Sequence, residues 1–445
     1  MANPPEEVQL WQTAEPVEFN PTTKDRNEGQ SILISARQGV GYAVAAGQLS
    51  HAIQSRATHL LLDYSQKACG MRYQIDGSWE PLPPIDRETG DAMLYALKQL
   101  CQLNPADRRS SQQGKVHAKI RKDKFVVAMH TQGIPTGERV LIKIEAEKIP
   151  FETLADLGMR DKMVTDLRQQ LNAEKSLVLI TAPPGGGLTT TWQTAIESAD
   201  RLIRDFQSFE DDNQPEPEII NVSPNYFGGD TGLTQMEALR KQILKEPDVM
   251  VFPEFPEPDT LEMAFEQVNK IDKQIYLRAK ATSAIEGLVQ LIARYPGLRG
   301  EFAKHTTAVT CQKLVRRLCD TCKVGFQPPP QLLQQLGIPQ GRVSVLYQPF
   351  VPPPPEQQVD EQGRPAPIEP CGMCMGRGYF GRIGIFELLS PGEKLRDALT
   401  KSNDIGQLTQ IAKTEGHRTL QMEAVMTVAR GLTGLDELKR AFARA

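Results

Sequence analysis

Residues 176–197 are the stretch that most constrains how this chain can fold. Ser176 to Ala182 form a largely apolar run that is typical of a buried parallel strand. Two prolines and three glycines follow, and the residues from Trp192 to Glu197 can then form a helix. In a strand, a glycine-rich turn and a helix arranged in this order, backbone N–H groups and the helix N-terminus can hold an anion. The stretch therefore has the layout of a phosphate-binding loop.

The turn departs from the usual phosphate-loop pattern at its charged position. That pattern is G-x-x-x-x-G-K-[ST], and the last three positions here read Gly187, Leu188 and Thr189. Leucine thus stands where a lysine would reach the terminal phosphates. The local sequence leaves two interpretations equally open: a nucleotide site that has lost its cation, or a plain connection between a strand and a helix.

Strands alternate with helices after the turn. The sequence predicts an acidic stretch with Glu210, a strand at about 219–222, a helix at about 233–245, a strand ending at Glu254, a helix at about 258–269 and a strand at about 274–277. This alternation indicates a parallel, doubly wound sheet, in which ligands bind at the carboxyl ends of the strands. Residues 185–189, Glu210 and Glu254 are expected at such ends, although either glutamate alone is equally compatible with a solvated loop.

Two C-x-x-C pairs are the strongest chemical signal in the sequence. They are formed by Cys319 with Cys322 and by Cys371 with Cys374. Four thiolates can complete a tetrahedral zinc site, and they leave no open position for catalysis, so the site would be structural. The alternatives are four ordinary thiols or a redox pair. The other three cysteines stand alone and are expected to be buried small side chains.

Composition narrows the class of protein. The 51 basic and 55 acidic residues give a net charge of −4, which does not indicate a nucleic-acid-binding protein. The sequence has no run of eighteen apolar residues, so no transmembrane segment is expected. Seven cysteines and no apolar stretch of signal-peptide length near the first residue predict a reducing, cytoplasmic environment.

Several motifs together resemble the hexameric secretion ATPases of type II secretion and type IV pilus assembly, from about residue 40 to the end of the chain. The most specific are residues 312–323 and 371–389, which contain the cysteine pairs. Further matches are residues 73–77, 107–109, 137–140, 239–240 and 246–251. On these motifs the chain is identified as a member of that family.

The resemblance implies a domain order. A loose leader at 1–40 is followed by a small α+β, PAS-like domain at 41–150 and a RecA-like parallel-sheet P-loop domain at 151–312. A tetracysteine zinc module with a proline-rich insert at 313–386 and a helical domain at 387–445 complete the chain. The resemblance also implies a homo- or hetero-hexamer and platform proteins of the inner membrane as partners. The chain would be cytoplasmic and peripheral to that membrane, with a leader too short for the larger docking domain of many relatives.

The resemblance further assigns roles in a nucleotide site. Its loop would be made by Pro184, Gly185, Gly186, Gly187, Leu188, Thr189 and Thr190, with Thr189 contacting magnesium. Glu210 and Glu254 would be its catalytic carboxylates. The family's lysine is Leu188, a histidine of the family aligns with Lys280, and an arginine of its first domain aligns with Ala128.

These departures weaken both binding and catalysis. One lost charge-assisted bond costs about 1.5–3 kcal/mol, or roughly ten- to a hundredfold in affinity. Each lost donor to the reacting phosphoryl group costs about 10²–10³ in rate. The leading hypothesis is therefore a ring subunit that binds ATP with Mg²⁺ weakly and hydrolyses it weakly or not at all. The alternatives are an active motor that uses Lys280 or a neighbouring subunit's cation, and a structural zinc adaptor that binds no nucleotide.

Overall fold

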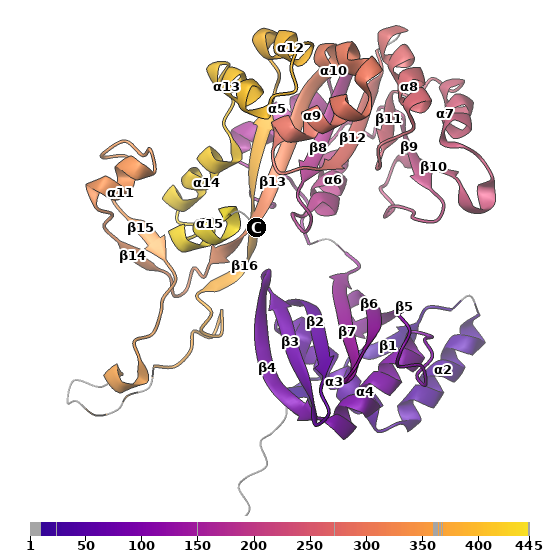
Figure 1. The fold of residues 1–445 in the computed structure, drawn as a ribbon, viewed down its shortest axis with the longest axis vertical. Helices are drawn as coiled ribbons and strands as arrows, with labels where there is room; N and C mark the ends of the chain where they lie inside the picture. The colour runs from indigo at the N-terminus through magenta and orange to yellow at the C-terminus, as the bar shows by residue number, and fades with distance from the viewer. Residues whose placement is uncertain are drawn as a thin grey trace, which may run out of the picture. The chain divides into compact units, whose positions relative to one another are not determined.

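A computed structural model describes residues 10–443, apart from residues 24, 149, 271, 359–363, 365 and 367. The chain divides into two compact units, Met1–Pro150 and Phe151–Ala445. Each unit contains one seven-stranded sheet (Figure 1). Among the described residues, no helix combines the length and the apolar character needed to cross a bilayer.

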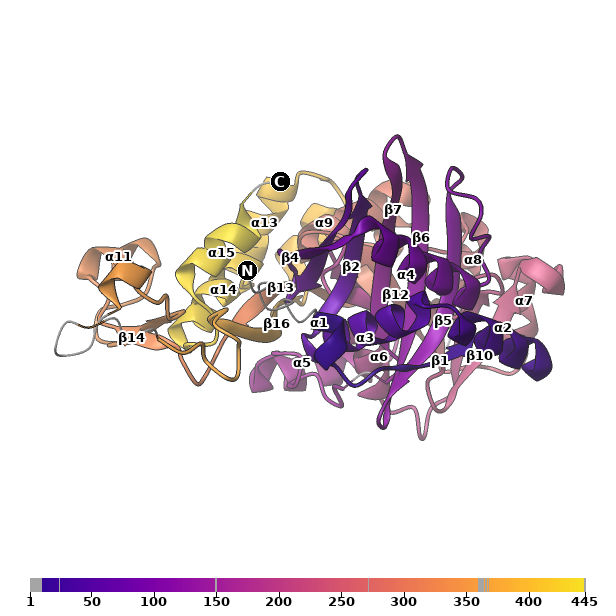
Figure 2. The ribbon, with the colours of Figure 1, turned by 90° about the horizontal axis from the view of Figure 1, so that it is seen from below.

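The first unit is an antiparallel sheet with helices on one face. Its elements are α1 (Leu10–Thr13), β1 (Glu18–Pro21), α2 (Arg26–Gln38), α3 (Gly41–Gln54), β2 (Ala57–Tyr64), β3 (Ala68–Ile75), β4 (Ser78–Asp86), α4 (Arg87–Leu100), β5 (Gln112–Ile120), β6 (Asp123–Ile134) and β7 (Gly137–Ala146). The strand order is β1-β5-β6-β7-β2-β3-β4. Side chains alternate along each strand, so Leu60, Leu62 and Tyr64 of β2 join the core under α3 and α4. Figure 2 shows these helices packed along one side of the sheet.

The prediction of a loose leader over 1–40 is wrong for the described part of that segment. Strand β1 pairs with β5, with Glu18 opposite Lys119 and Pro21 opposite Val116. Val17 and Phe19 are buried, and Asp25 caps α2 by accepting a hydrogen bond from the Asn27 N–H at 2.9 Å. A four-residue strand between prolines is too short to give a periodic signal, and its position is fixed by its partner strand.

The second unit is a mainly parallel sheet covered on both faces. Its strands are β8 (Ser176–Ala182), β9 (Phe206–Asp211), β10 (Val222–Phe227), β11 (Val249–Phe252), β12 (Gln274–Lys280), β13 (Thr306–Leu318) and β16 (Tyr379–Leu389). They lie in the order β10-β9-β11-β12-β8-β13-β16, and only β16 runs antiparallel to its neighbour. A small pair, β14 (Val324–Phe326) and β15 (Leu346–Gln348), lies outside this sheet.

Two apolar clusters attach several helices of the second unit to the sheet. The helices are α5 (Asp161–Leu171), α6 (Leu188–Glu197), α7 (Gln235–Ile243), α8 (Pro258–Lys270), α9 (Ala284–Arg294), α10 (Arg299–His305), α11 (Pro330–Gln335), α12 (Glu393–Leu399), α13 (Ile405–Thr414), α14 (Leu420–Ala429) and α15 (Leu435–Phe442). On one face, α5 and α6 pack on Val178 and Ile180 of β8. On the other face, α8, α9 and α10 pack on Leu177 and Leu179. A parallel sheet with helices on both faces is the predicted doubly wound arrangement.

The structure also shifts several predicted boundaries. The strand expected at 219–222 begins at Val222, after Asn221 adopts a φ of 63°. The boundaries expected at 312/313 and 386/387 fall inside β13 and β16, which are paired strands of the large sheet. These two limits therefore divide strands of the large sheet, whereas the cysteines lie beyond the ends of those strands, as does the small pair of β14 and β15. Nothing in the sequence between Thr306 and Leu318 breaks the strand, so a boundary there was incorrect.

Candidate functional site

The predicted phosphate loop connects β8 to α6. All seven residues of β8 are buried, which fixes where the loop begins. Gly185 and Gly187 have φ values of 71° and 84°, a region that residues with a Cβ rarely adopt. The Pro183 carbonyl accepts a hydrogen bond from the Gly186 N–H at 2.8 Å, so the turn is closed. Gly187 caps α6 in the left-handed conformation, which leaves the first N–H groups of the helix at the loop.

The side chain of Gln312 in β13 forms a hydrogen bond with the backbone of the phosphate loop. Its side chain is buried, and its Nε2 donates to the Gly186 carbonyl at 2.8 Å. A Cβ added at Gly187 would lie 3.1 Å from the same Nε2, which adds crowding to the strain that the positive φ would impose on any other residue. Gln312 is the first residue of the motif at 312–323, but that motif does not predict this role. The contact joins residues 126 positions apart, and local sequence gives no signal for it.

Leu188, which stands in place of the phosphate-loop lysine, contacts the apolar core. Leu188 is half-buried and packs against the cluster that contains Trp192, Val178 and Ile180. Thr189, the next residue, is exposed and lines a cavity. The loop therefore keeps its backbone geometry and its hydroxyl group, while the side chain at position 188 supplies neither charge nor a hydrogen-bond donor.

The cavity beside Thr189 lies between α6 and the strands β9, β10 and β11, and it has a volume of about 190 Å³. Its wall includes Trp192 of α6 and Glu210 of β9. Glu210 is buried, and its Oε2 accepts a hydrogen bond from the Glu216 N–H at 3.0 Å. The structure thus brings Thr189 and Glu210 to one cavity, as the sequence predicts for this edge of the sheet.

The remaining predicted site residues lie at this end of the sheet with different exposure. Pro184 and Gly185 are exposed, and Thr190 is half-buried in the first turn of α6. Glu254 is exposed, two residues beyond the end of β11, and does not belong to the cavity wall. The two proposed carboxylates therefore have different surroundings, with Glu210 tied to the backbone and Glu254 facing solvent.

Sequence reasoning missed a cation beside this cavity. Arg278 of β12 forms an ion pair with Glu216, with Nη1 and Oε2 2.8 Å apart and a second bond from Nη2 to Oε1. Its guanidinium carbon lies 5.6 Å from the centroid of the Trp192 ring. Both Glu216 and Trp192 line the cavity. Arg278 lies within β12 and belongs to no motif, so only the sheet order reveals its position beside the cavity.

The four predicted zinc ligands form one cluster. The Sγ atoms of Cys319, Cys322, Cys371 and Cys374 all lie within 4.8 Å of one another. The Cys319–Cys371 and Cys322–Cys374 Sγ pairs are 3.8 and 3.6 Å apart. Tetrahedral zinc with Zn–S bonds of about 2.3 Å places sulfurs about 3.8 Å apart, whereas a disulfide needs about 2.05 Å. The cluster therefore fits a metal and not disulfides.

Burial and backbone N–H groups act in opposite directions in this cluster, since burial raises the pKa of the Cys322 and Cys374 thiols above the ordinary value. The N–H groups of Cys374 and Met373 lower the pKa of the Cys371 thiol to about 7. The Gly378 N–H donates to the Cys374 Sγ at 3.3 Å. The chemistry of four sulfur donors held by short turns is that of a closed structural zinc site.

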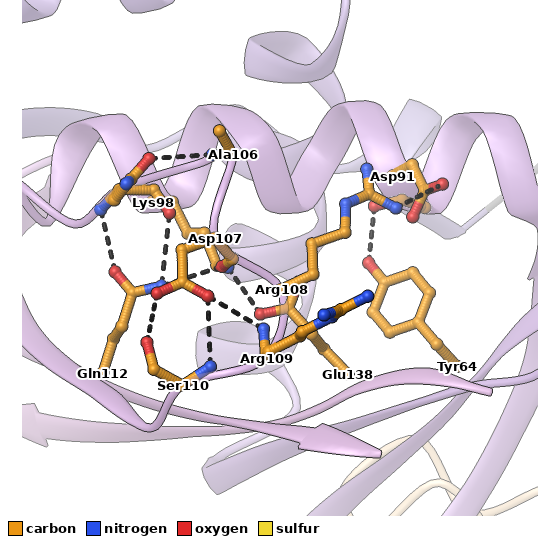
Figure 3. A network of polar contacts seen from close by, with 12 residues as sticks. Tyr64, Asp91, Lys98, Ala106, Asp107, Arg108, Arg109, Ser110, Gln112 and Glu138 are labelled. Carbon is orange, nitrogen blue, oxygen red and sulfur yellow. Dashed lines mark hydrogen bonds and ion pairs between the residues drawn. The ribbon is translucent and has the colours of Figure 1, made fainter. Parts of the chain in front are cut away.

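In the first unit, the motif residues 107–109 and 137–140 meet in a structural network (Figure 3). Lys98 Nζ lies 2.5 Å from Glu138 Oε1 and donates to the Asp107 carbonyl at 2.7 Å. Both charged side chains are almost fully buried, with exposures of 1% and 2%. The Asp107 carboxylate accepts from the N–H groups of Arg109 and Ser110. These motif residues hold a loop against the sheet.

Comparisons with known proteins find relatives similar in sequence and in fold. The sequence pattern of the family described as Type II/IV secretion system protein matches residues 40–440. The chain is 25% identical over 389 residues to the Type IV pilus assembly ATPase PilB of Thermus thermophilus, an alignment that covers 86% of this chain and 41% of that protein. It is 26% identical over 392 residues to the Protein transport protein HofB homolog of Escherichia coli, covering 88% and 79% of the two chains. The chain thus spans less than half the length of the Thermus relative.

Solved structures share the fold. The ATPase DotB of Legionella pneumophila superposes with a TM-score of 0.56 at 13% identity, covering 90% of this chain and 95% of that one. DotB of Yersinia pseudotuberculosis gives a TM-score of 0.54 at 12% identity, covering 98% and 99% of the two chains. At these identities the similarity concerns the fold alone.

Proposed function

Because the chain belongs to the Type II/IV secretion system protein family, we propose that it is a ring subunit of a secretion or pilus-assembly motor with a weakened nucleotide site. It would bind ATP with Mg²⁺ through the loop amides and Thr189, and hydrolyse ATP weakly or not at all. The observation that supports this proposal is that Leu188 packs against the apolar core, while Gly185 and Gly187 of the loop keep their left-handed backbone conformation. The site retains an anion-binding backbone and lacks the cation.

The groups that remain in the site explain why nucleotide binding and hydrolysis are expected to be weak. Backbone N–H groups and the N-terminus of α6 can still hold phosphate oxygens, and a hydroxyl such as that of Thr189 can contact Mg²⁺. Bound Mg²⁺ would neutralise the charge that develops on the transferred phosphoryl group. Glu210 would orient what binds beside Thr189, because both line the same cavity. Because position 188 carries a leucine and no cation, the stabilisation of this charge is incomplete.

The finer architecture belongs to the same proposal. The parallel-sheet unit would be RecA-like, the first unit PAS-like, and the four cysteines would hold structural Zn²⁺. The assembly would be a homo- or hetero-hexamer that works with inner-membrane platform proteins, cytoplasmic and peripheral to that membrane.

Two other functions compete with this one. An active motor would use Lys280 or a cation from a neighbouring subunit, and the position of Lys280 at the end of β12 supports it. A zinc-containing adaptor without any nucleotide would use the second unit only as a scaffold, which the cysteine cluster supports.

Binding and turnover of magnesium nucleotides by the purified chain distinguish the three functions. A fluorescent ATP analogue should bind in a magnesium-dependent manner, with turnover near background. Robust turnover that is abolished by Glu254→Gln would overturn the proposal in favour of the active motor. An absence of binding, also in the Leu188→Lys variant, would favour the adaptor.

A further inference from the structure

Arg278 is held in place by two groups that differ in kind. Its side chain is 15% exposed, and that of its partner Glu216 is 18% exposed. Two hydrogen bonds join the guanidinium to the Glu216 carboxylate, and the ring of Trp192 lies beside the same guanidinium. Planar guanidinium groups bind carboxylates and phosphates through the same pair of parallel bonds. Glu216 therefore fills a position that a phosphate group could also occupy.

The cation lies on the same face of the sheet as the phosphate-loop helix. Its contact with Trp192 places it under α6, whose first residues are Leu188 and Thr189. Arg278 pairs with Ile180 of β8, two positions before the strand ends at Ala182. Because Trp192 and not Glu216 provides the stacking contact, the guanidinium would keep this place if Glu216 left.

The segment that carries Glu216 also forms a hydrogen bond with Glu210. The Glu216 N–H donates to Glu210 Oε2, so one residue engages a cation and a carboxylate of the same cavity. In this arrangement the cavity of about 190 Å³ is smaller than the roughly 300–1,000 Å³ of typical small-molecule sites. Because Glu216 binds both groups, a phosphate that binds Arg278 would have to displace it.

We propose that Arg278 supplies the phosphate-binding cation in place of the lysine lost at Leu188, and that Glu216 is its internal competitor. In the nucleotide-free chain, the Glu216 carboxylate occupies the guanidinium as a phosphate would. When a nucleotide binds, its terminal phosphate displaces Glu216, and the same movement releases Glu210. This inference rests on the proposed nucleotide-binding function and adds a regulation of that site.

The test compares the wild-type chain with five variants, using a fluorescent ATP analogue and Mg²⁺. Glu216→Gln keeps the size of the side chain and removes its charge, so it should tighten binding by about tenfold. Arg278→Gln should weaken binding, and the Glu216→Gln/Arg278→Gln double variant should show no gain over Arg278→Gln alone. Glu262→Gln removes an equal charge from an exposed position of α8 that does not line the cavity, and it should change affinity less than twofold. Arg278→Lys should retain part of the affinity.

Hydrogen exchange provides a readout that needs no nucleotide. Glu216→Gln should accelerate amide exchange at Glu216, whose N–H is held by Glu210. Faster exchange with unchanged nucleotide affinity would overturn the competitor role, as would unchanged exchange. A gain that persists in the double variant would overturn the role of Arg278. If the wild type, Glu216→Gln and Leu188→Lys all fail to bind nucleotide, the proposed function itself fails. If all three bind but Glu216→Gln does not change the affinity, only the present inference fails.

Discussion

Lys280 and Ala182 are partners at the ends of two neighbouring parallel strands, and the phosphate loop begins directly after Ala182. The Ala281 N–H donates to the Ala182 carbonyl at 3.1 Å, so the two strand ends are fixed together. Since side chains alternate, Lys280 lies on the same face as Arg278, which contacts α6. Lys280 is thus an exposed cation near the loop, whereas Arg278 is a mostly buried one.

We expect Lys280→Ala to weaken binding of the magnesium nucleotide by only about two- to fivefold, because an exposed charge contributes about 0.2–1 kcal/mol. Equilibrium titration with the fluorescent analogue measures this change. Lys270→Ala, at an exposed lysine of α8, is the control and should have no effect. A hundredfold fall in turnover with Lys280→Ala would instead support the active motor.

Restoring the lysine of the phosphate loop should strengthen binding. Leu188→Lys adds one charge-assisted donor, and we expect ten- to a hundredfold tighter binding, or about 1.5–3 kcal/mol. Loss of the apolar contact of Leu188 should lower thermal stability slightly, since this side chain is half-buried. Leu188→Met keeps the apolar contact and should leave affinity unchanged. Equal affinity in the Lys and Met variants would show that the loop no longer holds a phosphate.

The contrast between Leu188 and Arg278 explains what the sequence could predict. The loop is one continuous segment, so its strand, glycines and altered lysine position were readable directly. The pair of Arg278 and Glu216 joins residues 62 positions apart, and it forms only because β9, β11 and β12 are neighbours. Strand order is a property of the whole sheet, and no local pattern encodes it.

The same contrast between local patterns and strand pairing holds for the four cysteines and for strand β1. The cysteine pairs were predicted to meet because metal chemistry restricts their partners, and the structure brings the four Sγ atoms together. The strands that carry them toward the main sheet, β13 and β16, were not predicted as one sheet, since an antiparallel pair across a long insert leaves no turn signal. Strand β1 was missed because its position depends on pairing with β5.

Removing one cysteine of the cluster should abolish metal binding. We expect about one zinc per chain after purification under reducing conditions, and loss of that zinc with Cys374→Ser. The melting temperature should fall as well, because the cluster joins segments on either side of a long insert. Cys101→Ser, at a buried cysteine of the first unit, should leave the metal content unchanged. Metal analysis that finds no zinc in the wild-type chain would contradict the proposed site.

The Asp107 carboxylate should make the first unit sensitive to acid. Hydrogen bonds from the Ser110 hydroxyl and the backbone N–H groups of Arg109 and Ser110 lower the pKa of Asp107 to about 2. A carboxyl group whose pKa is lower in the folded state stabilises it above the ordinary pKa of about 3.9, and this stabilisation is lost as the pH falls toward 2.

Asp107→Asn should therefore unfold at lower urea concentration than the wild type at pH 7, and this difference should shrink between about pH 4 and pH 2. The unfolding can be followed by fluorescence in a Trp192→Phe background, since the remaining tryptophans, Trp11 and Trp79, both belong to the first unit. A difference that stays constant across this range would mean that the Asp107 charge does not contribute.

The buried ion pair of Lys98 and Glu138 gives the largest expected effect on stability. Lys98→Met would leave the Glu138 carboxylate 2% exposed and without its cation, and breaking such a pair costs about 3–5 kcal/mol. The Lys98→Met/Glu138→Leu double variant replaces both charges by apolar groups and should recover most of this loss, although the Asp107 carbonyl would also lose its bond from Lys98. Urea unfolding in the same Trp192→Phe background measures all three chains. If the double variant is as unstable as Lys98→Met, the network of Figure 3 depends on the Asp107 contact rather than on the ion pair.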